Sequence, residues 1–394
     1  MPYQLSHITA GFVAVLVGFT SSVAIVLQAA AAAGATPEQI NSWLLALGTA
    51  MGITCIGFSW HYRQPILTAW STPGAALLVT GLSGQSIELA TGAFVAAALL
   101  IVVTGVTGWF ERVMNKLPYE LAAAMLAGVL LQFGFKLFLS IETQPWLIVV
   151  MFISYLAGKS FWPRFNIPIV LVIAVIISGL KGLLNFSEFN PGLATPVWVT
   201  PEFSWQTFIS VAVPLFIVTM ASQNMPGIAV LKAAGYKPPI SKLVTGTGLC
   251  TLVLAPLGCF AINLAAITAA ICAGKEADPD AENRYKAAIC AGIFYLLTGI
   301  FGATVVALFA AFPAELVAAI AGLALLGTIG NSLATALSSE SAREPALITF
   351  LVTASGVSLL DIGSAFWGLL AGGIALFISH QRKVATSRTK KTLT

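Results

Sequence analysis

The chain has 394 residues, of which 58% are hydrophobic and only 9% are charged, and its mean hydropathy is +0.92. A water-soluble domain needs more charge than this to cover its surface, so the composition excludes a soluble protein and indicates a polytopic membrane protein embedded in a lipid bilayer. The formal net charge of +4 comes mostly from the C-terminal end, so it does not indicate a nucleic-acid partner. The five cysteines lack paired spacing, which predicts small buried residues and no metal site.

Apolar segments follow one another along the whole chain. Several are shorter than the ~20 residues that a full crossing needs, notably the third and the tenth, so we expect half-helices there. In chain order the fourteen predicted segments are 8–29, 41–60, 73–83, 87–110, 119–139, 145–158, 165–182, 205–222, 240–256, 262–273, 285–309, 314–336, 344–359 and 364–380.

The stretch TAWSTPGAALL, Thr68–Leu78, begins without helical periodicity and then runs into an apolar helix. Thr72, Pro73 and Gly74 are typical of an N-cap, a first helical residue and a small residue beside it. An extended piece at bilayer depth is tolerated only against protein or a water-filled cavity, and the helix beginning after it attracts anions. We therefore expect half of a substrate site here, and the alternative is a proline-kinked span that serves packing alone. The candidate residues are Thr68, Ala69, Trp70, Ser71, Thr72 and Gly74.

A second polar group ends a long apolar run, in TMASQNMPGIAVLKAAGY. Ser222, Gln223 and Asn224 lie there, and Pro226 with Gly227 is expected to break or reset the helix. An unpaired amide in hydrocarbon is costly, so these side chains must face protein, water or ligand. Contact with a ligand and hydrogen bonding between helices are both open.

The two halves of the chain resemble each other. LPYELAAAMLAGVLLQFG (117–134) matches FPAELVAAIAGLALLGTIG (312–330), with Pro118 opposite Pro313 and Glu120 opposite Glu315. Seven segments per half require the second half to enter the membrane in the opposite orientation, and such inverted repeats are typical of secondary transporters.

The repeat extends the candidate site to other segments. PILTAW (65–70) falls in the same relative place as PLGCFAIN (256–263), which makes Cys259, Ala261 and Asn263 candidates before the tenth helix. In the first segment, Phe19 and Ser22 correspond to residues 220–223 and are candidates for the same cavity.

The basic residues predict the orientation. With the N-terminus inside, the outer loops hold only Lys136 and Lys181 of the nineteen lysines and arginines, which agrees with the positive-inside bias. Both termini are then cytoplasmic, residues 185–204 form a periplasmic linker between the repeats, and 381–394 form a cytoplasmic tail.

No segment carries the HExxH, GxSxG or P-loop spacing of an enzyme or ATPase, so we expect neither catalysis nor a cofactor, and a proton gradient as the energy source. Glu120 and Glu315 are best explained by helix beginnings at the membrane face, with proton coupling as the alternative.

TAWSTPGAALL, TMASQNMPGIAVLKAAGY and GSAFWG (363–368) together resemble the benzoate/proton symporter (BenE) family over essentially the whole chain. The resemblance implies the architecture of nucleobase and sulfate permeases, in which short strands lead into half-helices three and ten and the substrate lies between them. Nucleobase transporters have carboxylates in the eighth and tenth segments, where this chain has amides and apolar residues. That departure disfavours a nucleobase and leaves the proton carrier unassigned.

We therefore expect an all-α transporter that imports a small aromatic carboxylate, benzoate, with protons across a bacterial inner membrane. The core domain would comprise 1–110 and 205–309 and the gate domain 111–184 and 310–380, and a homodimer is left open. The alternatives are an inorganic anion, bicarbonate or nucleobase permease and, in another class, an uncoupled channel or a membrane sensor. A channel would favour a polar stripe along several helices, which this sequence lacks.

Overall fold

The structure is a computed structural model that describes residues 3–109, 119–187, 191–357, 359 and 364–391. The predicted gate residues 111–118 and the last three residues of the predicted tail lie outside this part. Nearly every described element is a helix, as expected for an apolar chain whose backbone must satisfy its own hydrogen bonds. The first half contains α1 (Leu5–Thr20), α2 (Val23–Ala32), α3 (Pro37–Tyr62), β1 (Thr68–Trp70), α4 (Thr72–Gly81), α5 (Ile87–Val106), α7 (Tyr119–Leu139), α8 (Pro145–Phe161) and α9 (Asn166–Leu180).

The second half repeats this order. It contains α10 (Trp205–Thr207), α11 (Val213–Thr219), α12 (Met225–Ala233), α13 (Ile240–Leu254), β2 (Ile262–Leu264), α14 (Ile267–Ala273), α15 (Tyr285–Ile300), α16 (Gly302–Ala310), α17 (Ala314–Ala336), α18 (Arg343–Ala354) and α19 (Ser364–Lys391). Among the described residues, six helices are long and apolar enough to cross a membrane, or eight if each bent pair counts as one span. Fourteen crossings therefore stay a prediction.

The first predicted segment is not one straight helix. It breaks between α1 and α2, which meet at an angle of 41°. Ser21 and Ser22 lie in the break, and both hydroxyls donate to the Gly18 carbonyl, at 3.0 and 2.8 Å. These bonds replace helical ones at the bend, so the segment can turn at bilayer depth without an unpaired backbone group.

The eighth segment was predicted to break or reset at Pro226 and Gly227, and it does not break but changes its hydrogen-bond spacing just before Pro226. One helix runs from Trp205 to Lys232 and contains two wide π turns, η2 (Phe208–Ala212) and η3 (Met220–Asn224). Pro226 follows the second turn directly, where the hydrogen-bond ladder changes its spacing and one N–H can be spared.

The packing of helices follows the inverted repeat. α3 packs on α15, and their counterparts α13 and α5 pack on each other. Likewise α8 packs on α9 as α18 packs on α19, and α7 and α17 pack on each other across the repeat axis. The helix packing therefore agrees with the predicted inverted repeat, while the count of seven spans in each half stays a prediction.

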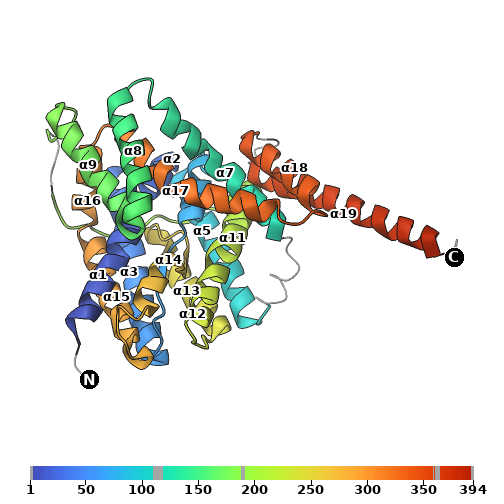
Figure 1. Cartoon of the computed structure of the whole chain (residues 1–394), viewed down its shortest axis with the longest axis horizontal. Helices are drawn as coiled ribbons and strands as arrows, with labels where there is room; N and C mark the ends of the chain where they lie inside the picture. Colours follow the sequence, from blue (N-terminus) through green and yellow to red (C-terminus); the bar gives the residue numbers. More distant parts are fainter. Residues whose placement is uncertain (1–2, 110–118, 188–190, 358, 360–363, 392–394) are drawn as a thin grey trace.

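Figure 1 shows α7, α8, α9, α17 and α18 along one side of the molecule and α1, α3, α12, α13, α14 and α15 along the other. These two groups contain helices predicted for the gate and for the core respectively, and the division into two domains stays a prediction. α19 projects from the body and continues as a helix to Lys391, through most of the stretch predicted as a tail (Figure 1).

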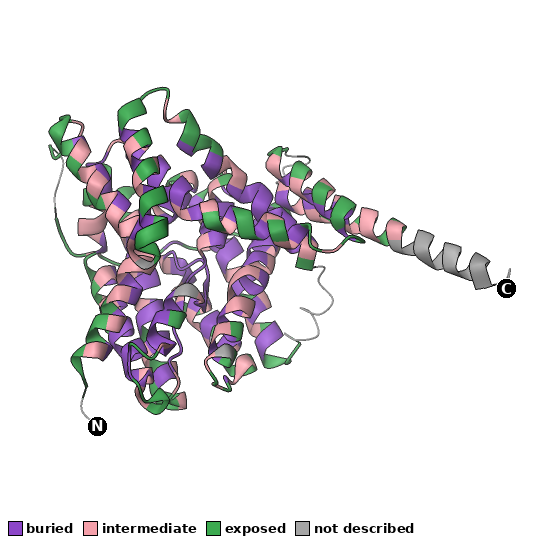
Figure 2. Cartoon of the chain, viewed as in Figure 1, coloured by how far each residue is buried: buried purple, intermediate pink, exposed green. Residues whose placement is uncertain are grey.

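Burial separates an interior from an apolar surface. In Figure 2 the buried residues gather where the helices meet, whereas exposed residues line the outer faces of α8 and α9. Many of these exposed side chains are large and apolar, including Trp146 at 71% and Leu180 at 84% exposure. Such a surface suits a lipid solvent.

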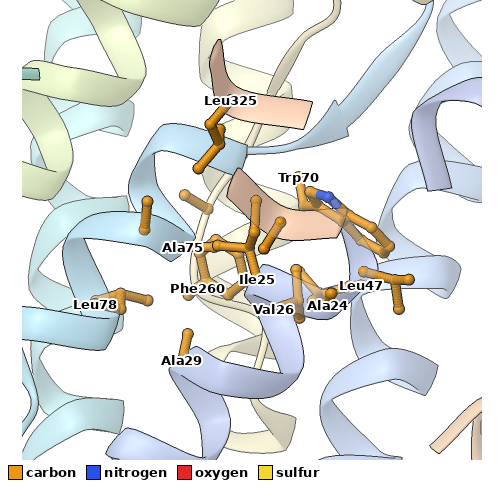
Figure 3. Close-up of a cluster of buried hydrophobic side chains, with 14 of the residues drawn as sticks. Ala24, Ile25, Val26, Ala29, Leu47, Trp70, Ala75, Leu78, Phe260 and Leu325 are labelled. Atoms are coloured by element: carbon orange, nitrogen blue, oxygen red, sulfur yellow. The ribbon is translucent and has the colours of Figure 1, made fainter. Parts of the chain in front are cut away.

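A buried apolar cluster surrounds the start of α4. Figure 3 shows Ile25 and Val26 of α2 between Leu78 of α4, Leu47 of α3 and Phe260 before β2. All five side chains are at most 1% exposed, so the central break of the chain is held by close packing of core helices.

Candidate functional site

Two short strands cross in the middle of the core. β1 and β2 pair antiparallel, with Thr68 opposite Leu264, Ala69 opposite Asn263 and Trp70 opposite Ile262. Their pairing lets extended backbone exist at bilayer depth, because each strand satisfies hydrogen bonds of the other. The predicted strands before the short third and tenth helices are thus present.

Polar side chains satisfy the strand edges that face away from the ladder. The Thr68 N–H donates to the Cys55 sulfur at 3.2 Å, and the Thr68 hydroxyl bonds that of Thr54 at 2.6 Å. On β2 the Leu264 N–H donates to the Asn224 side-chain oxygen at 2.9 Å. Two predicted site residues, Thr68 and Asn224, therefore support backbone.

The N-cap of α4 is Ser71, one residue before the predicted Thr72. The Ser71 hydroxyl accepts from the Gly74 N–H at 3.1 Å, and Thr219 of α11 donates to the same oxygen at 3.1 Å. Pro73 is consequently the second helical residue, which is still within the turn where a missing N–H is tolerated. The shift leaves Thr72 at the first helical position, where it lines the cavity described below.

The register proposed for the second repeat is wrong by three residues. The structural counterpart of β1 is Ile262–Leu264, so Cys259 and Ala261 precede the strand. The extra residues form the 3-10 turn Ala255–Leu257 and a left-handed Gly258 with φ of 100°. A side chain at that glycine would collide with the Trp43 ring, so this turn depends on glycine.

Trp70 is fixed on both its edge and one face. Its indole N–H donates to the Ser22 hydroxyl at 2.8 Å, and the Phe19 ring packs against it with centroids 5.2 Å apart. The side chain is only 4% exposed, yet it lines a cavity. Since its one donor is already used, Trp70 can offer a bound molecule ring surface and no hydrogen bond.

The cavity has a volume of about 490 Å³ and lies between the strand crossing and α17. That size is within the range of small-molecule sites. Among the residues that the structure describes, its lining contains no Lys, Arg, His, Asp or Glu. On the core side the polar lining residues are Ser21, Ser22, Thr72, Ser222, Gln223, Thr268 and Tyr295, and on α17 they are Thr328, Asn331, Ser332 and Thr335.

The predicted residues divide between the cavity and its surroundings. Six of them line it: Ser22, Ala69, Trp70, Thr72, Ser222 and Gln223. The other eight lie outside its lining: Phe19, Thr68, Ser71, Gly74, Asn224, Cys259, Ala261 and Asn263. With its amide oriented to satisfy both neighbours, Asn263 donates to the Leu264 carbonyl and accepts from the Ser71 N–H, each at 3.0 Å. Its side chain therefore links β2 to the residue that follows β1.

Sequence reasoning missed the lining that comes after β2 and from the gate. Ala265, Ala266 and Thr268 take the place of the three misregistered residues, and Tyr295 comes from α15. On α17 the polar residues recur at positions i, i+3, i+4 and i+7 from Thr328, on an otherwise apolar helix. That spacing puts them on one helix face and was the available signal.

The benzoate membrane transport protein (BenE) family matches residues 1–378. The chain belongs to this family. It is 51% identical over 371 residues to the inner membrane protein YdcO of Escherichia coli, covering 94% of each chain. It is 40% identical over 383 residues to the benzoate membrane transport protein of Acinetobacter baylyi, covering 97% of each. The BenE member described here is therefore a membrane transport protein and not an enzyme.

Solved structures share the fold of this BenE member at low sequence identity. The transmembrane domain of the cyanobacterial bicarbonate transporter BicA superimposes with a TM-score of 0.59 at 11% identity and covers 93% of this chain and 97% of that one. Murine Slc26a9, an anion transporter in the inward-facing state, superimposes with a TM-score of 0.59 at 13% identity, over 95% of this chain and 68% of that one.

Proposed function

We propose that this BenE protein imports a small aromatic carboxylate, most simply benzoate, with a proton across a bacterial inner membrane. The observation that carries the proposal is the cavity, which combines aromatic side chains with uncharged hydrogen-bonding ones. Membership of the family and the relative named as a benzoate membrane transport protein support the same substrate class.

The ring of the substrate would lie against Trp70. The Ser22 hydroxyl accepts from the indole N–H, and the Phe19 ring packs against the indole. These two contacts hold the Trp70 ring in one orientation. Offset or edge-to-face contact between aromatic rings adds to the area that is buried, by about 0.5–1.5 kcal/mol. Tyr119 and Tyr295 also line the cavity, but Trp70 is the aromatic residue that belongs to the strand crossing itself.

The carboxylate would be held by neutral donors from the second repeat. Ser222, Gln223 and Thr268 all line the cavity, and hydrogen bonds to a charged group contribute about 1.5–3 kcal/mol each. The beginning of α4 adds a favourable dipole at Thr72. The opposite helix, α14, has only seven residues and contributes less than the sequence suggested. A site without a cation binds an anion moderately, which suits a transporter that must also release it.

The cavity opens toward one face of the molecule. Its gate-side lining comes from the start of α7 at Tyr119, the 3-10 turn before α9 at Pro163 and the end of α17 at Thr335. Lys159 in the last turn of α8 and Arg343 at the start of α18 lie close to these residues in the sequence, and the positive-inside bias favours a cytoplasmic position for this face. On the other side α4 packs against α7. We propose that this is an inward-facing state and that both termini are cytoplasmic.

The driving force and the assembly remain parts of the proposal. The described part of the lining has no carboxylate or histidine that would carry the coupled proton, so the carrier is unassigned. The energy would come from the proton gradient, without a cofactor. A homodimer, the remaining partner expected from the sequence, would be detected by cross-linking in native membranes.

Uptake by proteoliposomes tests the proposal. The purified protein should accumulate labelled benzoate when an inward proton gradient is imposed, and a protonophore should abolish that accumulation. Unlabelled benzoate should compete, whereas bicarbonate, sulfate and uracil should not. Uptake of bicarbonate or uracil without benzoate would overturn the substrate, and gradient-independent benzoate flux would overturn the coupling.

A further inference from the structure

The gate helix α17 shows which helix face borders the substrate path. Ala324, Leu325, Thr328, Asn331 and Ser332 line the cavity, and all lie on one side of the helix. This face is opposite the start of α14, and the cavity separates the two elements. The face therefore forms the gate-side wall of the path in the state that is open on this side.

The inverted repeat places the corresponding face on α7. We extend the alignment of Pro118 with Pro313 and of Glu120 with Glu315 along both helices without inserting a gap. In this register Phe133 corresponds to Thr328 and Leu137 to Ser332. Lys136 corresponds to Asn331. The residues at the far end of α7 are thus the counterparts of the wall just described.

In this structure the α7 face is closed. Phe133 is 3% exposed and Leu137 is fully buried, and both lie beside Gly322 of α17. α4 packs on α7, whereas the cavity lies between the equivalent elements α14 and α17. In the alternate state of the transporter, α4 would separate from α7 and α14 would pack against α17. The α7 side would then be open and the α17 side closed. Lys136, which is exposed here, would then border the open mouth.

We infer that Lys136 captures the anionic substrate at the outer mouth, an inference that rests on the proposed function. It is one of only two basic residues predicted on that side, and the cavity lining has no charged side chain among the described residues. A cation beside an uncharged site raises the local concentration of anions and their rate of entry. At the corresponding position of α17 the residue is the neutral Asn331, so the charge at this position belongs to the α7 side alone.

The test measures benzoate uptake by right-side-out and inside-out vesicles with the full chain. A unit charge at about 10 Å in water changes local anion concentration roughly twofold. Lys136→Gln should therefore raise the apparent KM about twofold at about 0.01 M salt, where the Debye length is about 30 Å, and not at about 1 M, where it is about 3 Å. Lys136→Glu should raise it about fourfold. Both effects should be confined to right-side-out vesicles, with the maximal rate unchanged.

Two further variants separate capture from other roles. Lys181→Gln removes the other outer lysine and should leave the KM unchanged, and Asn331→Lys should lower the KM only in inside-out vesicles. A merely structural role of Lys136 at the end of α7 would change the melting temperature or act equally at both salt concentrations, and either result overturns the inference. So does an unchanged KM, or an effect confined to inside-out vesicles. If the wild-type protein does not transport benzoate at all, the proposed function fails instead.

Discussion

The two halves of the strand crossing share a backbone plan and differ in chemistry. Each half has a three-residue strand, a short connection and a helix. The first half brings Trp70 to the cavity, and Ser71 caps the helix after it. The second half brings Gln223 and Thr268, and Ala266 starts its helix without a side-chain cap. A pseudo-symmetric scaffold can therefore hold an asymmetric molecule, with its ring toward one repeat and its charge toward the other.

The largest expected effect on benzoate affinity comes from removing Gln223, a polar side chain that the second half brings to the cavity. Gln223→Ala should weaken benzoate binding by about tenfold or more, because a hydrogen bond to a charged group contributes about 1.5–3 kcal/mol. Equilibrium binding of labelled benzoate to purified protein measures the change, and the melting temperature should stay the same. Unchanged affinity would mean that the carboxylate does not reach this side.

Replacing Asn224, the neighbouring amide, should lower stability more than it lowers benzoate affinity. Asn224→Ala leaves the Leu264 N–H without an acceptor at a fully buried position, so the free energy of unfolding should fall by about 1–3 kcal/mol. Thermal unfolding in detergent measures the loss, with Gln223→Ala as the matched control. A stable Asn224→Ala protein that binds benzoate weakly would make Asn224 a ligand residue and contradict its structural assignment.

The aromatic half is tested through the residue that orients Trp70. Ser22→Ala removes the acceptor of the indole N–H and should loosen the ring, so that affinity falls about fivefold, equivalent to about 1 kcal/mol. Ser21→Ala is the control, since Ser21 bonds the same Gly18 carbonyl without touching Trp70 through a hydrogen bond. Equal effects of the two variants would show that the bend between α1 and α2 matters and the orientation of Trp70 does not.

The smallest expected effect is on stability at low pH. It comes from a contact between the loop after α14 and the start of α1, away from the strand crossing. The Asp280 N–H and the contact with His7 hold the pKa of the Asp278 carboxyl below its ordinary value. The unfolded chain then binds this proton more readily, so the carboxylate stabilises the fold above about pH 4 and the contribution is lost as the pH falls below that.

Melting temperatures between neutral pH and pH 3 measure this dependence. Asp278→Asn should flatten it, whereas Glu282→Gln, at an exposed position of the same loop, should not. A wild-type protein that gains stability on acidification through this range would contradict the assigned direction.

Much of the fold was predictable because membrane constraints leave few options. Long apolar runs had to be helices, and a segment such as Thr68–Trp70, without helical periodicity but at bilayer depth, had to be supported by protein. The π turn at Met220–Asn224 was not predictable, since Pro226 normally ends a helix and only the widened ladder before it spares the missing N–H.

Half of the site was predictable for a related reason. Polar residues in apolar segments stand out, so Trp70 and Gln223 were found, but which polar side chains bond backbone and which line a cavity depends on orientation. Asn224 and Gln223 are adjacent and have opposite roles. The residues after β2 were missed because a three-residue turn with a left-handed Gly258 shifted the register between repeats.

The most direct test of the account is benzoate binding to a protein whose cavity is filled. Ala324 lines the cavity from α17, and Gly327 on the same helix is exposed and has open space around it. Ala324→Trp should abolish binding of labelled benzoate by folded, monodisperse protein, and Gly327→Trp should retain the wild-type affinity. Wild-type affinity in Ala324→Trp would show that benzoate does not bind between the strand crossing and α17.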